Sequence, residues 1–160
     1  MKHLIRVAAL FLIALAFASM VQADQNFTIV QDTPTIIHVD VGAEGHTHGD
    51  IMAFTASFVT EDGKTGIMRG IIMTVDIPLP SSGKVLHDRL AQIVVEFGEA
   101  DTLVIGGSAT YPTGDGEMFT DSPQLRAVIG GTGRFIGARG QVATVRLNTG
   151  LYEHRFTLLE

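Results

Sequence analysis

The sequence predicts an all-β protein. From Asn26 onward, almost every segment either alternates apolar with polar residues or is rich in β-branched residues, which is the pattern of strands. Short runs of glycine, proline, aspartate and serine separate these segments and favour turns. No segment keeps a sustained helical period, so no helix is expected in the folded domain.

Nine segments have the strand pattern, and their boundaries are set by the turn residues between them. The clearest separators are EDGK (61–64), PLPSSGK (78–84), GEAD (98–101) and PTGDGEMFTDSP (112–123), followed by a glycine turn and NTG (148–150). Short connections favour antiparallel hairpins. The expected strands are 26–31, 35–41, 50–60, 66–76, 89–97, 102–111, 124–130, 134–147 and 151–159.

Long antiparallel strands in a small domain favour closure into a barrel, because an open sheet would expose unpaired backbone groups at its edges. Merging one or two of the nine segments gives about eight strands, the number at which a barrel interior just holds side chains or one small ligand. The sequence therefore predicts an eight-stranded antiparallel β-barrel with an apolar interior cavity. Glycines within strands would supply the bends, at Gly70, Gly106, Gly107, Gly137 and Gly140.

The glycine-rich stretch LRAVIGGTGRFIGARGQV (125–142) is not expected to bind a dinucleotide. Gly131, Gly133 and Gly137 have GxGxxxG spacing, and the following QVATVRL alternates as a strand, whereas a phosphate-binding turn leads into a helix. The glycines are better explained as a tight hairpin followed by a bent strand.

The first 23 residues have the features of a secretory signal peptide. Lys2 and Arg6 precede the apolar run VAALFLIALAFA, and VQA (21–23) offers small residues for cleavage before Asp24. Twelve apolar residues are too few to span a bilayer. The sequence thus predicts a secreted or periplasmic single domain over 24–160, an uncleaved anchor being the alternative. Without cysteine, this domain relies on packing alone.

Charge excludes some partners. The formal net charge is −6 and becomes −8 once the leader is removed. A chain this acidic is not expected to bind nucleic acid or an anionic membrane surface.

The motif AVIGGTGRFIGARGQVAT (127–144) closely resembles the signature hairpin of dirigent proteins, which carry V(I/V)GGTG and ARG around a phenylalanine. The rest of the chain resembles allene oxide cyclase, which has the same superfamily fold. GDIMAF (49–54), HDRL (87–90) and FGEADTLVIGGSATY (97–111) are similar to cyclase motifs, and GQV (140–142) matches a cyclase feature that dirigents lack. The likeness covers roughly residues 49–159 in order.

This resemblance implies a homotrimer of eight-stranded barrels, each with an apolar cavity and without a cofactor. It implies a small apolar ligand or substrate. In a dirigent-type coupling, a partner oxidase would supply the reactive intermediate. In the same resemblance, Arg139 would brace the glycine hairpin.

The segment TIIHVDVG (35–42) carries two polar residues on one face of its expected strand, His38 and Asp40. They lie either in solvent or at the cavity mouth, depending on which face is buried. Both related families carry an acid that serves the site on this strand. The resemblance therefore implies Asp40 as a catalytic acid and His38 as a ligand contact.

Tyr111 aligns with the second tyrosine of a pair in allene oxide cyclase. In the site it would donate a hydrogen bond to a developing enolate or a bound carbonyl. The alternative is structural, with its ring capping the barrel and its hydroxyl in water. The first tyrosine of the cyclase pair is Ser108 here, and the cyclase's pocket cysteine has no counterpart.

Other candidates are weaker. Arg69, Asp76 and Glu96 interrupt apolar strands and are expected at the surface or in ion pairs. HTHG (46–49) with Asp50 or His38 offers metal-binding side chains, but its spacing is not specific and no metal is assigned. The side chains expected to contact a ligand, besides His38, are Phe54, Phe58, Met73 and Phe97.

Two classes of function remain open. In the first, the barrel holds a reactive apolar molecule in one conformer and directs a stereoselective cyclisation or coupling. In the second, it is a non-catalytic module that carries an apolar ligand or presents a loop, such as 112–123 with Met118 and Phe119, to a partner. Vacant interior volume beside an acid and Tyr111 favours the first. An interior filled by apolar side chains excludes it.

Overall fold

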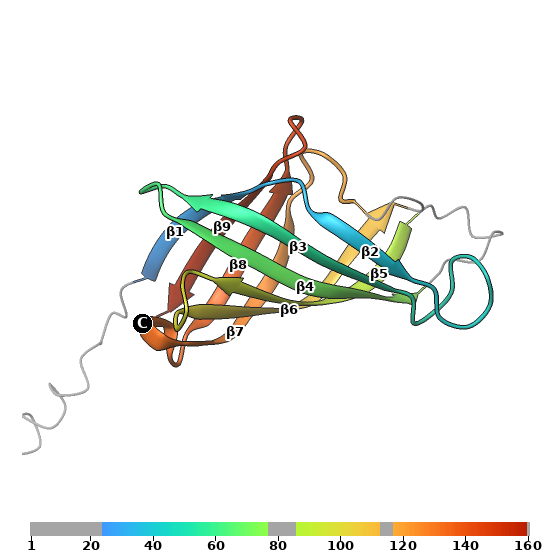
Figure 1. The fold of residues 1–160 in the computed structure, drawn as a ribbon, viewed down its shortest axis with the longest axis horizontal. Coiled ribbons are helices and arrows are strands. Elements are labelled where there is room, and N and C mark those ends of the chain that lie inside the picture. The colour runs from blue at the N-terminus through green and yellow to red at the C-terminus, as the bar shows by residue number, and fades with distance from the viewer. Residues whose placement is uncertain (1–23, 77–85, 113–116, 160) are drawn as a thin grey trace, which may run out of the picture.

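The computed structural model describes residues 24–76, 86–112 and 117–159 (Figure 1). The predicted leader, residues 1–23, lies outside these ranges. The described strands are β1 (Asp24–Gln31), β2 (Thr35–Val39), β3 (Ile51–Thr60), β4 (Thr65–Asp76), β5 (Leu86–Glu96), β6 (Thr102–Pro112), β7 (Gln124–Thr132), β8 (Arg139–Arg146) and β9 (Tyr152–Leu159), with a short 3-10 turn η2 (Gly133–Phe135). No helix in the described part is long and apolar enough to cross a membrane.

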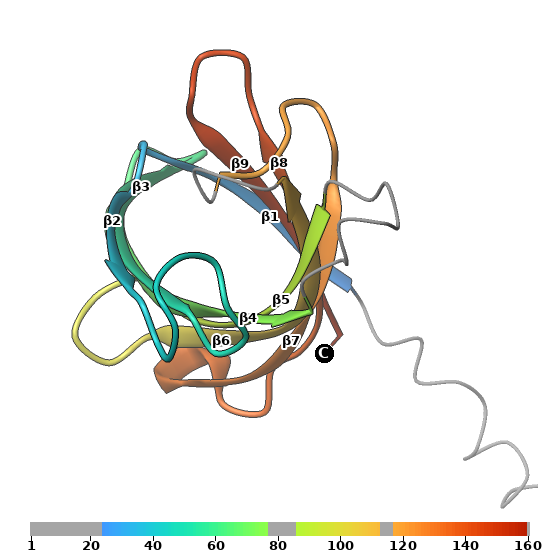
Figure 2. The ribbon, with the colours of Figure 1, turned by 90° about the vertical axis from the view of Figure 1, so that its right-hand side faces the viewer.

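These strands form one antiparallel sheet that closes on itself (Figure 2). Closure occurs at β1, which pairs with β9 on one side and with β3 on the other, so that Gln31 lies opposite both Tyr152 and Phe58. β2 continues along β3 after β1 ends. Counted as one bent strand, β1 and β2 complete a ring of eight. The predicted eight-stranded antiparallel barrel is confirmed.

The bend between β1 and β2 lies at residues 32–34. Asp32 still donates its backbone N–H to the carbonyl of Ser57 (2.9 Å), but Pro34 has no N–H to donate and interrupts the ladder. Pairing resumes at Thr35, opposite Thr55. Beyond this bend, β2 is bonded only to β3, so the barrel wall has an unpaired edge on this side.

The glycine motif differs from the prediction in one respect. β7 runs to Thr132, the chain then turns through η2, and β8 begins only at Arg139, so the expected strand start at residue 134 is wrong. The turn forms because Gly133 has a positive φ of 59° and packs tightly, since a Cβ there would lie 2.7 Å from the carbonyl oxygen of Ala100. Asp101 accepts a hydrogen bond from the backbone of Arg134 (3.0 Å) and also pairs with its side chain. Arg134 therefore braces this connection through Asp101.

A cluster of phenylalanines fills the end of the barrel that holds the two termini of the described chain. Phe27 stacks on Phe156 with ring centroids 4.7 Å apart, and Phe97 meets the edges of Phe27 (5.8 Å) and Phe58 (5.2 Å). Phe135 covers the cluster from η2. This end is closed by aromatic packing, which we call the closed end.

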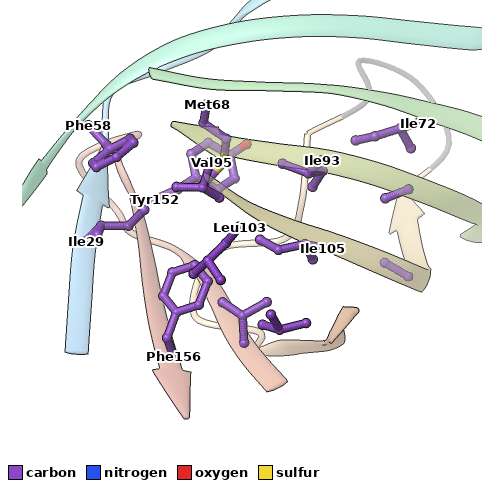
Figure 3. Packing of buried hydrophobic residues seen from close by; sticks show 14 of the residues in the cluster. Ile29, Phe58, Met68, Ile72, Ile93, Val95, Leu103, Ile105, Tyr152 and Phe156 are labelled. Carbon is purple, nitrogen blue, oxygen red and sulfur yellow. The ribbon is translucent and has the colours of Figure 1, made fainter. Parts of the chain in front are cut away.

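The remaining core lies just inside the closed end. Fully buried aliphatic side chains from several strands meet there, namely Ile29, Met68, Val95, Leu103, Ile105 and Val142. In Figure 3, Ile72 and Ile93 lie farther along β4 and β5, away from Phe58 and Phe156. The opposite end of the barrel, which carries the 40–50 loop in front of the ring of strands in Figure 2, is called the mouth.

Candidate functional site

Between the phenylalanine cluster and the mouth, the inward faces of the strands become polar. Six polar or charged side chains of the described residues are buried, and most are on the alternating positions that continue the apolar core. On β9, for example, Tyr152 and His154 precede Phe156 and Leu158 on the same face. The six are Gln31, Thr74, Arg89, Arg126, Thr144 and His154.

Four of the six, Gln31, Arg126, Thr144 and His154, border a small interior cavity of about 50 Å³, whereas Thr74 and Arg89 lie nearer the mouth. A space of this size holds a few water molecules or one polar group of a ligand. The rest of the interior at this level is occupied by side chains. The lining residues are Gln31, Pro34, Ile36, Met52, Phe54, Met68, Ile72, Ile93, Tyr111, Met118, Arg126, Thr144, Tyr152 and His154.

Tyr111 is the centre of a first polar group. Arg126 donates a hydrogen bond from Nη2 to the Tyr111 hydroxyl oxygen (2.8 Å), and the Arg89 guanidinium lies over the Tyr111 ring, 5.0 Å from its centroid. Tyr111 is only 3% exposed. Because its oxygen accepts from Arg126, its own proton is left to donate to another acceptor.

A second polar group surrounds His154. Gln31 donates from its amide nitrogen to the carbonyl of Asp32 (3.2 Å), which turns its amide oxygen toward His154 Nε2 (2.9 Å). His154 Nε2 must then carry the proton, and Nδ1 accepts from the Thr144 hydroxyl (2.9 Å). Burial, and secondarily the charge of Arg126, lowers the pKa of His154 to about 3. The ring is therefore neutral at neutral pH.

The segment 117–121 covers one side of the cavity. The backbone of Asp121 donates to the carbonyl of Arg146 (2.9 Å), and Glu117 forms an ion pair with the side chain of Arg146. Met118, expected to be exposed, is 4% exposed and enters the interior, whereas Phe119 is exposed as expected. Burial, with the nearby charge of Glu117, raises the pKa of Tyr152 to about 12, so its hydroxyl stays protonated.

The mouth holds a second cavity of about 240 Å³. Met52 lines both cavities, and Arg89, whose Nη1 lies 3.5 Å from the Met52 sulfur, lines the outer one. His38 and Asp40 line this outer space and are exposed. Larger hollows lie elsewhere on the surface, but none of them is lined by the buried polar side chains.

Asp50, not Asp40, organises the loop at the mouth. Its carboxylate accepts hydrogen bonds from the backbone N–H groups of Val41 (3.0 Å) and Thr47 (2.7 Å), and these bonds lower its pKa. Asp40 accepts one bond, from the backbone of Gly45 (3.2 Å). No group of three or more histidine, aspartate or glutamate side chains arranged to hold a metal ion occurs among the described residues.

The structure brings together only part of the site expected from the sequence. Tyr111 and Phe54 line the inner cavity, and His38 and Asp40 lie at the mouth. Phe58 and Phe97 belong to the closed end, away from both cavities. Met73 is 37% exposed and lies on the outer face of the barrel, not in either cavity. Arg69 and Glu96 form a surface ion pair, as one expectation had it.

Sequence reasoning missed Arg89, Arg126 and His154. The signal that could have found them is their position, because each lies two residues from a buried apolar residue on the same strand face: Ala91, Val128 and Phe156. A charged residue on an otherwise apolar face either carries a partner or serves a site.

Comparison with known proteins supports the fold. No family model and no curated protein sequence matches the chain. Among solved structures, a pyocyanin demethylase aligns with a TM-score of 0.63 at 16% identity, over 84% of this chain and 99% of that one. A heme-binding cyclase that catalyses a 4 + 2 cycloaddition in neoabyssomicin biosynthesis gives 0.60 at 15% identity, over 91% and 68%. The Diels-Alderase AbmU from Streptomyces koyangensis gives 0.60 at 17%, over 88% and 64%.

These likenesses show a shared barrel fold. At such low identity they do not transfer an activity. The resemblance to allene oxide cyclase and dirigent proteins therefore rests on the sequence motifs described above.

Proposed function

We propose that this barrel binds a small, mostly apolar molecule through its mouth and directs a stereoselective cyclisation or coupling of it. The observation that carries the proposal is the environment of Tyr111, a buried hydroxyl fixed by Arg126 at the wall of a cavity that apolar side chains line together with a few polar ones. Burying a polar group costs free energy, and an apolar core packs without one. The buried polar groups around Tyr111 therefore favour a role in a binding or catalytic site. The names of the cyclases with the same fold agree with this class of reaction.

The proposed reaction requires positioning and one hydrogen bond from the residues of the barrel. Apolar walls that hold a flexible molecule in one folded conformer bring its reacting atoms together, and this positioning alone lowers the barrier. Tyr111 would donate its proton as a hydrogen bond to an oxygen on which negative charge develops. In this proposal His38 and Asp40 meet the molecule at the mouth and not at the reacting atoms.

A non-catalytic carrier is the second candidate, and the size of the inner cavity favours it. About 50 Å³ is far below the ~300–1,000 Å³ of ordinary ligand sites, so a bound molecule must either extend into the mouth or displace side chains such as Met52. A carrier would show the same binding without turnover.

Replacing Tyr111 by Phe tests the catalytic proposal. The molecule retained by the protein in its own host would first be identified by native mass spectrometry and extraction. With it or its precursor as substrate, Tyr111→Phe is expected to reduce the rate about 10²-fold, because it removes one donor to the developing charge, while binding persists. Chiral chromatography of the product gives both rate and stereochemistry.

Two further variants sharpen this test. Thr110→Val changes a hydroxyl on the outer side of the same strand and should leave the rate unchanged. Asp40→Asn tests the acid implied by the sequence resemblance. A reduction in rate as large as that of Tyr111→Phe would indicate that Asp40 acts at the reacting atoms. Unchanged turnover in Tyr111→Phe would reject its proposed role.

A homotrimer is the second part of the proposal, and the outer face of the barrel supports it. Val39, Ile51, Met73 and Leu90 lie side by side across β2 to β5 and form a row of apolar side chains, three of them 37–48% exposed. Apolar rows of this kind on a soluble protein mark surfaces that bury against a partner. We assign this row to contact with further copies of the chain.

Leu90→Glu is expected to convert the trimer to monomers, since it places a charge in the middle of the apolar row. Light scattering coupled to size-exclusion chromatography measures the mass. Ile136→Glu, at an 81% exposed position on the β7–β8 connection, should leave the mass unchanged. A monomeric wild-type protein would contradict the assignment.

Export is the third part. It is supported by the charged, apolar and small-residue segments of residues 1–23, which lie outside the described structure.

A further inference from the structure

Two arginines are buried in the barrel, and no carboxylate of the described residues forms an ion pair with either of them. Arg89 is 3% exposed and Arg126 is 5% exposed, and the Nε atom of each is buried with no hydrogen-bond partner in the part of the chain that the structure describes. We propose that the ligand of this barrel carries a carboxylate, which binds to Arg126 at the inner cavity with the charge of Arg89 nearby. This inference rests on the proposed function and names its ligand class.

The contacts that the two guanidinium groups do make are weak or incomplete. Among the described residues, Arg126 donates one hydrogen bond, to a neutral hydroxyl, and Arg89 contacts a thioether sulfur and an aromatic face. A buried guanidinium has five N–H donors, and leaving it without a counter-charge costs several kcal/mol (order of magnitude). Arg126 lines the inner cavity and Arg89 lies over the ring of Tyr111, which lines the same cavity, so an anion bound there would be attracted by both charges.

The described acidic side chains do not supply that anion. The ion pairs among described residues are Lys64–Asp62, Arg69–Glu96, Arg134–Asp101, Arg146–Glu117 and Arg155–Glu153, and none includes Arg89 or Arg126. Asp50 attracts Arg89 electrostatically, but its oxygens are held by Val41 and Thr47. His154 is neutral. The charge facing the inner cavity is therefore positive.

A carboxylate matches the geometry of this site. The inner cavity of about 50 Å³ accommodates one carboxylate, and the planar fork of Arg126 can pair with its two oxygens. The rest of the molecule would extend past Met52, whose flexible thioether side chain can move aside, into the mouth cavity of about 240 Å³. Together the two spaces approach the lower limit of ordinary ligand sites, about 300 Å³. The ligand class is thus a small apolar carboxylic acid.

Three probes with the same apolar chain and different head groups test the inference: octanoate, 1-octanol and octylamine. Isothermal titration calorimetry of the purified folded protein is expected to show octanoate binding at least about tenfold more tightly than 1-octanol, with octylamine weakest. In Arg126→Met, which keeps the side-chain volume and removes the charge, the preference for octanoate should disappear while 1-octanol binding persists. The matched control is Arg155→Met, on the outer face of β9.

Each other outcome counts against the inference. Equal or tighter binding of 1-octanol to the wild-type protein overturns the charge assignment and leaves the proposed apolar-ligand function standing. A preference for octanoate that survives in both Arg126→Met and Arg89→Met overturns the placement of the carboxylate. If none of the three probes binds, the inference fails together with the proposed ligand binding. The wild-type comparison decides the first point even if a variant does not fold.

Discussion

Acidification is expected to destabilise the barrel through His154 before the carboxylates begin to titrate. The pKa of this buried ring lies at about 3, below its ordinary value of 6.5. At pH values between these two, the His154 ring is protonated in the unfolded chain but neutral in the folded chain. The free energy of unfolding therefore falls as the pH falls, by about 1.4 kcal/mol per pH unit, and by roughly 5 kcal/mol in all near pH 3.

Urea denaturation at pH 7.0, 6.0 and 5.5 measures this slope in a range where carboxylates stay ionised. His154→Gln should lack the contribution and be less pH-dependent than the wild type, although its lost contacts with Thr144 and Gln31 lower its stability at pH 7. His38→Gln, at an exposed position, should keep the wild-type slope. Equal slopes in the wild type and His154→Gln would contradict the neutral, buried state of the ring.

Phe156→Ala is expected to lower the free energy of unfolding by about 3–5 kcal/mol. Phe156 is 1% exposed and stacks on Phe27 at 4.7 Å, so its removal leaves a void that neighbours on paired strands cannot close. Chemical denaturation at pH 7 gives the difference.

Leu125→Ala is the matched control, because this side chain is 62% exposed and its loss should change stability by less than about 0.5 kcal/mol. A cost below about 1 kcal/mol for Phe156→Ala would show that the closed end is loosely packed. It would also remove the basis for distinguishing the two ends of the barrel.

The strands and the barrel were predictable because apolar alternation and turn residues are local signals. Which face of a strand points into the barrel was harder to predict where both faces of the strand are apolar. In the segment GIIMTVD (70–76), Ile72 and Thr74 point inward, and Ile71 and Met73 point outward. Because successive residues here are apolar, the sequence does not show which of the two sets faces the interior.

The candidate site was less predictable for two further reasons. β2 ends at Val39 and both of its faces are largely exposed, so the sequence could not decide whether Asp40 enters the cavity. Arg89, Arg126 and His154 come from three strands far apart in the chain, and only the closed ring brings them together inside the barrel. Arg126 and His154 line the inner cavity, and Arg89 lies over the ring of Tyr111. Tyr111 was found by its alignment with the cyclase motif.

β9 carries both kinds of inward residue on one face, polar at Tyr152 and His154 and apolar at Phe156 and Leu158. The packed core that stabilises the barrel and the polar side chains of the candidate site are therefore separate, although they lie on the same strands. Under the proposed function, substitutions near the mouth would change which ligand binds without disturbing the phenylalanine packing of the closed end.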